Sequence, residues 1–131
     1  RLPLLFDAMV SKGRLGLSKF VELTATAPAR LYNLHPRKGS IAIGADADIA
    51  IWDPTRKTVL SDTTFRDRTG YTPYAGREIV GWPVTVLRRG EGIVRDGTLD
   101  AKPGSGAHLP RSGGRTAASL GRVTPDTFWG V

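Results

Sequence analysis

The sequence predicts an α+β fold in which helices come first, a small antiparallel sheet follows, and an extended tail ends the chain. The helices are indicated by apolar residues spaced i, i+3, i+4 between Leu2 and Val10. The sheet is indicated by a change to a period of two from residue 39. The tail, residues 101–131, is rich in Gly, Ser, Pro, Thr and Arg, so by itself it buries little apolar surface.

The first helix is expected over residues 2–10. Pro3 suits its first turn, because the missing N–H would be unpaired there in any case. Gly13 can end the helix in the left-handed conformation.

Two further helices are expected before residue 35. Ser18 is the predicted N-cap of the second helix. Pro28 is expected to end or restart that helix near Thr26, because proline cannot donate the helical hydrogen bond. Residues 29–32 then form a short third helix, closed by Asn33.

The first strands are predicted from alternating apolar residues. Residues 40–43 and 49–52 both alternate, and residues 44–47 supply turn chemistry between them. Asp53–Pro54 is expected to end the second strand, and residues 57–60 are a candidate third.

The remaining sheet residues follow a polar stretch. Residues 61–76 are expected to form a loop. Residues 84–89 and 92–95 predict a hairpin that turns at Gly90–Glu91, and Asp96–Gly97 is a further tight-turn signal.

The amino-acid composition excludes several classes of protein function. The 131 residues suggest one domain with a modest core, and no apolar run approaches the roughly 20 residues of a membrane helix. There is no cysteine, so disulfides, thiolate nucleophiles and sulfur-ligated zinc are excluded, and a cytoplasmic location is expected. The net charge of +7 comes from scattered basic residues, which disfavours nucleic-acid binding. The chain opens on Arg1 in what looks like a helix, which suggests a fragment or a processed product.

Three aspartates fall within eight residues: Asp46, Asp48 and Asp53. A hard-metal loop places several oxygen ligands at such spacings, but residues 49–51 are apolar and cannot complete the shell. The favoured interpretation is structural. Asp46 sits in a turn and accepts backbone N–H bonds, Asp48 faces outward, and Asp53 marks the end of a strand.

No residue is predicted to be catalytic or to bind metal. His35 and His108 form neither an H-x-H nor an H-E-x-x-H pattern, and no G-x-S-x-G motif is present. The segment is therefore expected to support a site formed elsewhere. Its structural motif consists of Gly39, Gly44, Asp46, Asp48, Asp53 and Pro54.

Residues 20–54, FVELTATAPARLYNLHPRKGSIAIGADADIAIWDP, resemble the C-terminal part of cyclic amidohydrolases. Pro36-Arg-Lys-Gly39 and the later stretch GWPVTVLRRGEGIVRDG favour the dihydropyrimidinase and D-hydantoinase branch over allantoinase and dihydroorotase. The resemblance extends from residue 1 to about residue 111.

The resemblance implies an architecture. Residues 1–35 would be the last helices of a metal-dependent (β/α)8 hydrolase barrel. Residues 36–100 would be the C-terminal half of a small composite β-sandwich, whose other strands belong to the N-terminal portion of the enzyme. Residues 101–131 would be a tail that contacts a neighbouring subunit of a homotetramer.

The resemblance also implies chemistry. In the family two divalent metals, usually zinc, activate a hydroxide that opens dihydropyrimidines or 5-substituted hydantoins to N-carbamoyl amino acids. The family's metal ligands all lie upstream of the matched segment, so this chain is expected to be inactive alone. Two alternatives stay open: a non-catalytic assembly protein of the same fold, similar to the collapsin response mediator proteins, and a small basic nucleic-acid-binding module.

Overall fold

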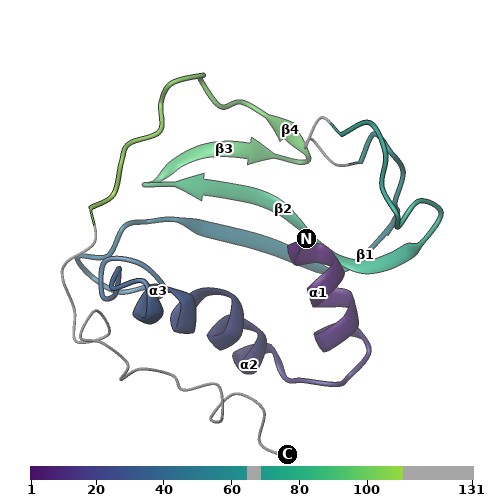
Figure 1. Ribbon diagram of the computed structural model, residues 1–131, viewed down its shortest axis with the longest axis horizontal. Helices are drawn as coiled ribbons and strands as arrows, with labels where there is room; N and C mark the ends of the chain where they lie inside the picture. The colour runs from purple at the N-terminus through teal and green to yellow at the C-terminus, as the bar shows by residue number, and fades with distance from the viewer. Residues whose placement is uncertain (65–68, 111–131) are drawn as a thin grey trace, which may run out of the picture.

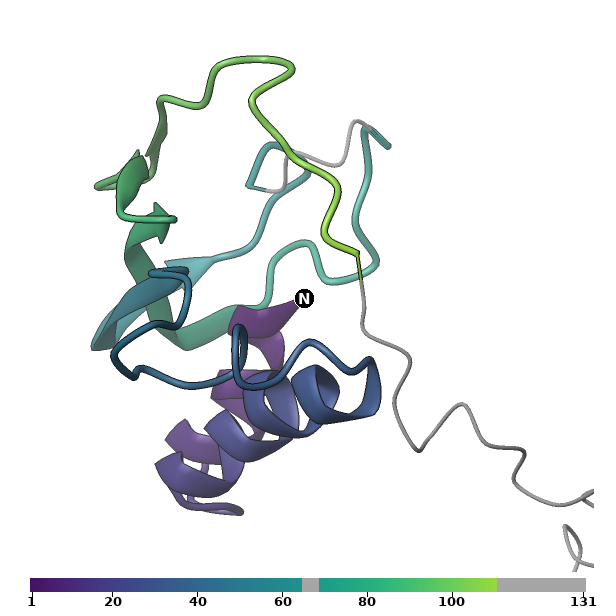
Figure 2. The ribbon, with the colours of Figure 1, turned by 90° about the vertical axis from the view of Figure 1, so that its left-hand side faces the viewer.

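The computed structural model of the protein describes residues 1–64 and 69–110, which form a helical layer beside an antiparallel sheet (Figure 1). The sheet order is β1-β2-β3-β4, so one edge of β1 is free among the described residues. The helices lie beside β1 and β2, away from β3 and β4, in both views (Figures 1 and 2). In chain order the elements are α1 (Leu2–Phe6), η1 (Asp7–Ser11), α2 (Leu17–Val21), η2 (Glu22–Thr26), α3 (Ala27–Leu31), β1 (Ile49–Val59), β2 (Glu78–Arg88), β3 (Glu91–Arg95) and β4 (Thr98–Leu99).

The first predicted helix is confirmed. It runs as α1 and continues without a break into η1, a wider π-helical turn. Gly13 follows it with φ +67°, the left-handed conformation expected of a residue that ends a helix.

The start of the second helix is predicted two residues too late. Gly16 is the N-cap, and α2 begins at Leu17, so the expected capping role of Ser18 is wrong. The predicted end or restart near Thr26 is confirmed as a restart, because the π-helical turn η2 ends at Thr26 and the chain continues directly into α3, whose first turn contains Pro28. A wider turn changes the carbonyl that each N–H faces, which accommodates a proline ring. Asn33, with φ +56°, follows the helix as expected.

Residues 40–43 are not a strand, which corrects the predicted strand-turn-strand. Ile41 is 84% exposed and Ile43 is fully exposed. Alternation produces a strand only where another strand supplies hydrogen bonds, and no described strand runs beside these residues.

Asp53–Pro54 does not end its strand either. β1 continues to Val59, so residues 57–59 belong to β1 and are not a separate strand. The register with β2 shifts between Asp53 and Lys57, which places Pro54 in a bulge. Proline is tolerated at a bulge of an edge strand because no ladder hydrogen bond is required there.

The hairpins after residue 77 are confirmed, with one shift. β2 and β3 pair antiparallel, but the turn residues are Arg89 and Gly90, one position earlier than predicted. Both have positive φ, +49° and +83°, as a two-residue hairpin loop requires. Asp96 and Gly97, at +47° and +80°, turn β3 into β4 in the same way.

An aromatic cluster joins the helices to the sheet. The ring of Phe6 in α1 stacks on Trp52 of β1 at a centroid distance of 4.8 Å, and meets Phe20 of α2 edge-on at 5.3 Å. Phe6 and Phe20 are buried. Aromatic rings bury the largest apolar areas of any side chains, so this cluster fixes how the two layers pack.

Within the described residues no helix is long and apolar enough to cross a membrane.

Candidate functional site

The predicted aspartates Asp46 and Asp48 lie in one cluster with Arg37, Lys38 and Arg89, the aspartate–cation cluster. The Asp46 carboxylate accepts hydrogen bonds from Arg37 Nε at 3.0 Å and from Lys38 Nζ at 2.8 Å. Asp48 accepts from Lys38 through Oδ2 and from the backbone N–H of Arg89, at 2.8 Å, through Oδ1. Lys38 therefore bridges the two carboxylates, and Asp48 ties the loop to the β2–β3 hairpin.

The charges of this cluster stabilise one another. The hydrogen bond from Lys38 is the main reason that the pKa of Asp46 lies below its usual value. Burial tends to raise the pKa of Asp48, but Lys38 and the Arg89 N–H outweigh it and lower this pKa. Burial tends to lower the pKa of Lys38, but the carboxylates of Asp46 and Asp48 outweigh this effect, so the pKa of Lys38 lies above its usual value. All three groups are therefore held in their charged forms.

The predicted role of Asp46 is wrong in detail, whereas the outward position predicted for Asp48 is confirmed. The Asp46 carboxylate binds side-chain cations and not the backbone N–H groups expected of a turn residue. Asp48 is partly exposed, as its outward position predicts, but its carboxylate is engaged on both oxygens. The sequence could not show this, because the Arg89 N–H that Asp48 binds is 41 residues away.

Asp53 organises the bulge that holds Pro54. Its Oδ1 accepts the backbone N–H groups of Thr55, at 2.9 Å, and of Arg56, at 3.1 Å. It also accepts the Thr55 hydroxyl at 2.8 Å, and these bonds hold the pKa of Asp53 below its usual value. Asp53 is thus a turn-forming residue, as predicted, although the strand continues beyond it.

These residues do not fit a divalent metal. No three His, Cys, Asp or Glu side chains gather into a potential metal-binding group in the described part of the chain. The carboxylates of the aspartate–cation cluster each bind an ammonium or a guanidinium group, which a metal would have to displace. His108 lies beside this cluster in a shallow cavity, whereas His35 is exposed in the loop after α3.

The sequence did not identify Asp7 as a residue that joins the helices to the sheet. Its side chain is only 4% exposed, and Oδ1 accepts the Val80 N–H of β2 at 3.1 Å. Its Oδ2 lies 3.2 Å from Lys12 Nζ and 3.6 Å from Arg77 Nη2. Burial tends to raise the pKa of Asp7, but the Val80 N–H and the two cations outweigh it and lower this pKa. The sequence signal was a charged residue within an apolar helix, although its partner Val80 is 73 residues away.

Gly39 and Gly44 both have positive φ angles, +84° and +87°, a conformation that residues with a Cβ rarely adopt. They differ in their surroundings: a Cβ on Gly39 would lie 2.5 Å from the Ala29 Cβ and 2.9 Å from the Ala25 carbonyl oxygen, whereas Gly44 faces open space.

Gly39→Ala is therefore expected to cost more than Gly44→Ala. The positive φ alone costs about 1 kcal/mol of unfolding free energy in each variant. The contact with the helical residues Ala25 and Ala29 should bring the Gly39→Ala loss to about 2 kcal/mol. Urea unfolding of both variants checks this, and equal losses would contradict the close packing at Gly39.

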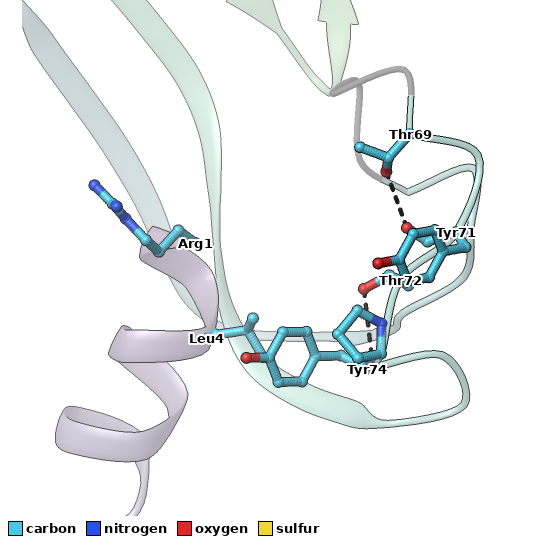
Figure 3. Close-up of a pocket in the computed structure, with 7 residues that line it drawn as sticks. Arg1, Leu4, Thr69, Tyr71, Thr72 and Tyr74 are labelled. Atoms are coloured by element: carbon cyan, nitrogen blue, oxygen red, sulfur yellow. Dashed lines mark hydrogen bonds between the residues drawn. The ribbon is translucent and has the colours of Figure 1, made fainter.

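A second surface hollow lies between α1 and the loop before β2 (Figure 3). Its cavity measures about 350 Å³. Leu4 projects from α1, and the Tyr74 ring extends across toward it from the loop, with Tyr71 beside it. Arg1, the N-cap of α1, borders the hollow, but its guanidinium points away from the two tyrosines. We name three of these residues, Leu4, Tyr71 and Tyr74, the tyrosine face.

Residues 10–91 match the model of the amidohydrolase family. The chain belongs to this family, in its cyclic amidohydrolase and hydantoinase branch. It is 45% identical over 112 residues to the D-hydantoinase of Geobacillus stearothermophilus and 42% identical over 111 residues to a D-phenylhydantoinase of Escherichia coli. These matches cover 86% and 85% of this chain, but only 24% of each relative.

Solved structures give the same result. The D-hydantoinase of a Bacillus species superposes with a TM-score of 0.82 at 42% identity, over 86% of this chain and 24% of that one. The dihydropyrimidinase of Brevibacillus agri superposes with a TM-score of 0.73 at 38% identity, over 76% and 22%. The predicted family and branch are confirmed, and the chain spans about a quarter of the length of its relatives.

Proposed function

We propose that this chain is the C-terminal part of a metal-dependent cyclic amidase that opens dihydropyrimidines or 5-substituted hydantoins to N-carbamoyl amino acids. The observation that supports this proposal most directly is the 45% identity to a D-hydantoinase. The match covers 86% of this chain but only 24% of that relative. The two divalent metals, which we propose to be zinc, would be held by residues outside this chain. The residues of this chain would stabilise the fold of the enzyme's C-terminal part.

The architecture that we propose assigns residues 1–35 to the last helices of a (β/α)8 barrel and residues 36–100 to a composite β-sandwich. The free edge of β1 supports this, because open edges in stable proteins are covered or paired. Exposed Ile41 and Ile43 support it further, since they would form a strand if a neighbour were present. The tail, residues 101–131, would contact another subunit of a homotetramer in the cytoplasm; residues 111–131 lie outside the described residues.

Many apolar side chains remain uncovered, which also supports a missing partner. Five hydrophobic residues among those described are buried, whereas fourteen large ones are exposed. A self-sufficient domain of this size would bury a larger share of its apolar residues.

The 131-residue chain is expected to bind no stoichiometric zinc and to open neither dihydrouracil nor hydantoin. Joined to the upstream three quarters of the Geobacillus stearothermophilus D-hydantoinase, in place of the matching segment, it should restore ring opening. Metal analysis and a ring-opening assay on both proteins check this. Turnover by the chain alone, or a folded, metal-loaded chimera without turnover, would overturn the proposal.

The coding sequence upstream of Arg1 separates the enzyme from a non-catalytic relative. An H-x-H motif after the first barrel strand is expected for the enzyme, because it supplies two imidazole ligands. Loss of that motif would favour the assembly protein.

A further inference from the structure

The tyrosine face exposes large side chains beside a hollow. Tyr71 is 69% exposed and Tyr74 is 43% exposed, although each carries a large apolar ring. Leu4 lies on the opposite side of the hollow, and Tyr74 extends toward it (Figure 3). The two tyrosines and Leu4 thus border the same hollow.

The loop that presents these rings is held in place by hydrogen bonds. The Thr72 N–H donates to Asp62 Oδ1 at 2.8 Å, and the Thr72 hydroxyl accepts from the Tyr74 N–H at 3.3 Å. The Gly76 N–H donates to the Leu60 carbonyl at 2.8 Å, and the Leu60 side chain is only 1% exposed. A surface ordered before binding loses little conformational entropy when a partner docks.

We infer that the tyrosine face docks against the upstream portion of the same hydrolase; this inference rests on the proposed function. Tyrosine is among the residues that most often dominate binding energy at interfaces. The relatives are about four times longer than the matched segment, so most of their polypeptide lies outside it and is available as the partner. The complementary surface would be apolar opposite Tyr71 and Tyr74.

Nitration of tyrosine tests the contact without mutation. The sequence has three tyrosines, and the third, Tyr32, is 56% exposed at the end of α3. All three should react with tetranitromethane in the chain alone. When the upstream portion of the Geobacillus stearothermophilus D-hydantoinase is added, Tyr71 and Tyr74 should become protected while Tyr32 continues to react. Protection that instead follows an increase in the chain's own concentration would assign the face to a second copy and overturn the inference.

Substitutions give a quantitative test. Tyr71→Ala combined with Tyr74→Ala should weaken association with the upstream portion at least about tenfold, as loss of a central interface residue does. The matched control Tyr32→Ala should change it less than about twofold. Tyr71→Phe with Tyr74→Phe keeps both rings and should retain most of the affinity. Circular dichroism of each variant confirms that the chain is still folded.

The outcomes separate the two proposals. If the wild-type chain neither associates nor restores ring opening, the proposed function is wrong and the docking partner falls with it. If the wild-type chain associates and ring opening returns, but the alanine pair binds as well as wild type, only the docking surface is wrong. Equal loss in Tyr32→Ala would also reject the docking surface.

Discussion

Gly81→Ala is expected to destabilise the chain by about 4 kcal/mol, the largest effect that we predict for one substitution. Gly81 lies in β2 with φ +97°, a conformation that costs an L-residue about 1–2 kcal/mol. A Cβ there would lie 2.2 Å from Phe6 Cδ1 and 2.4 Å from Phe6 Cε1. The strain and the overlap together give the predicted loss.

The Phe6 ring cannot move aside at low cost. It is 3% exposed, stacked on Trp52 at 4.8 Å and in edge contact with Phe20 at 5.3 Å. Cores are packed nearly as densely as crystals, so displacing one ring displaces its neighbours. Forcing extra volume into such a core typically costs about 1–3 kcal/mol.

Urea unfolding followed by tryptophan fluorescence measures the effect. The matched control is Gly90→Ala, because Gly90 has a similar φ, +83°, and a Cβ added there would meet no atom within 4 Å. That variant should lose only about 1 kcal/mol. Combining Gly81→Ala with Phe6→Ala removes the clashing ring, so the double variant should lose less than the sum of the single losses. Simple additivity would show that the Phe6 contact is not the cause.

The features that were predicted correctly from the sequence depend on residues close to one another along the chain. The helix over residues 2–10 follows from its apolar spacing, and the Asp96–Gly97 turn follows from two residues that tolerate positive φ. Both are local properties. The family resemblance was carried by residues 20–54 and is confirmed by the match over residues 10–91.

What the sequence could not show depends on distant partners. Residues 40–43 have a strand-like pattern but no neighbouring strand among the described residues, so alternation alone misleads. The bulge at Pro54 allows β1 to continue where proline suggested an end. The carboxylates of Asp48 and Asp7 bind backbone N–H groups 41 and 73 residues away, and no local pattern specifies such pairs.

Asp7→Ala is the second large effect, with an expected loss of about 3 kcal/mol at neutral pH. Alanine leaves the Val80 N–H without its acceptor and leaves Lys12 and Arg77 without their shared carboxylate. Asp7→Asn should lose less, about 1–2 kcal/mol, because the amide oxygen can still accept the Val80 N–H. The control is Asp96→Asn, which changes an exposed turn residue and should be nearly neutral.

The pH dependence gives a test that separates the charge of Asp7 from its shape. The folded pKa lies below the ordinary value of 3.8, so the folded protein favours the charged carboxylate more than the unfolded chain does. The resulting stability is fully present above about pH 4 and is lost as the pH falls through the folded pKa. The gap in melting temperature between wild type and Asp7→Asn should therefore be constant from about pH 7 to about pH 5 and shrink below about pH 4. A gap that stays constant down to about pH 3, or one that grows on acidification, would mean that the Asp7 charge does not hold α1 to β2.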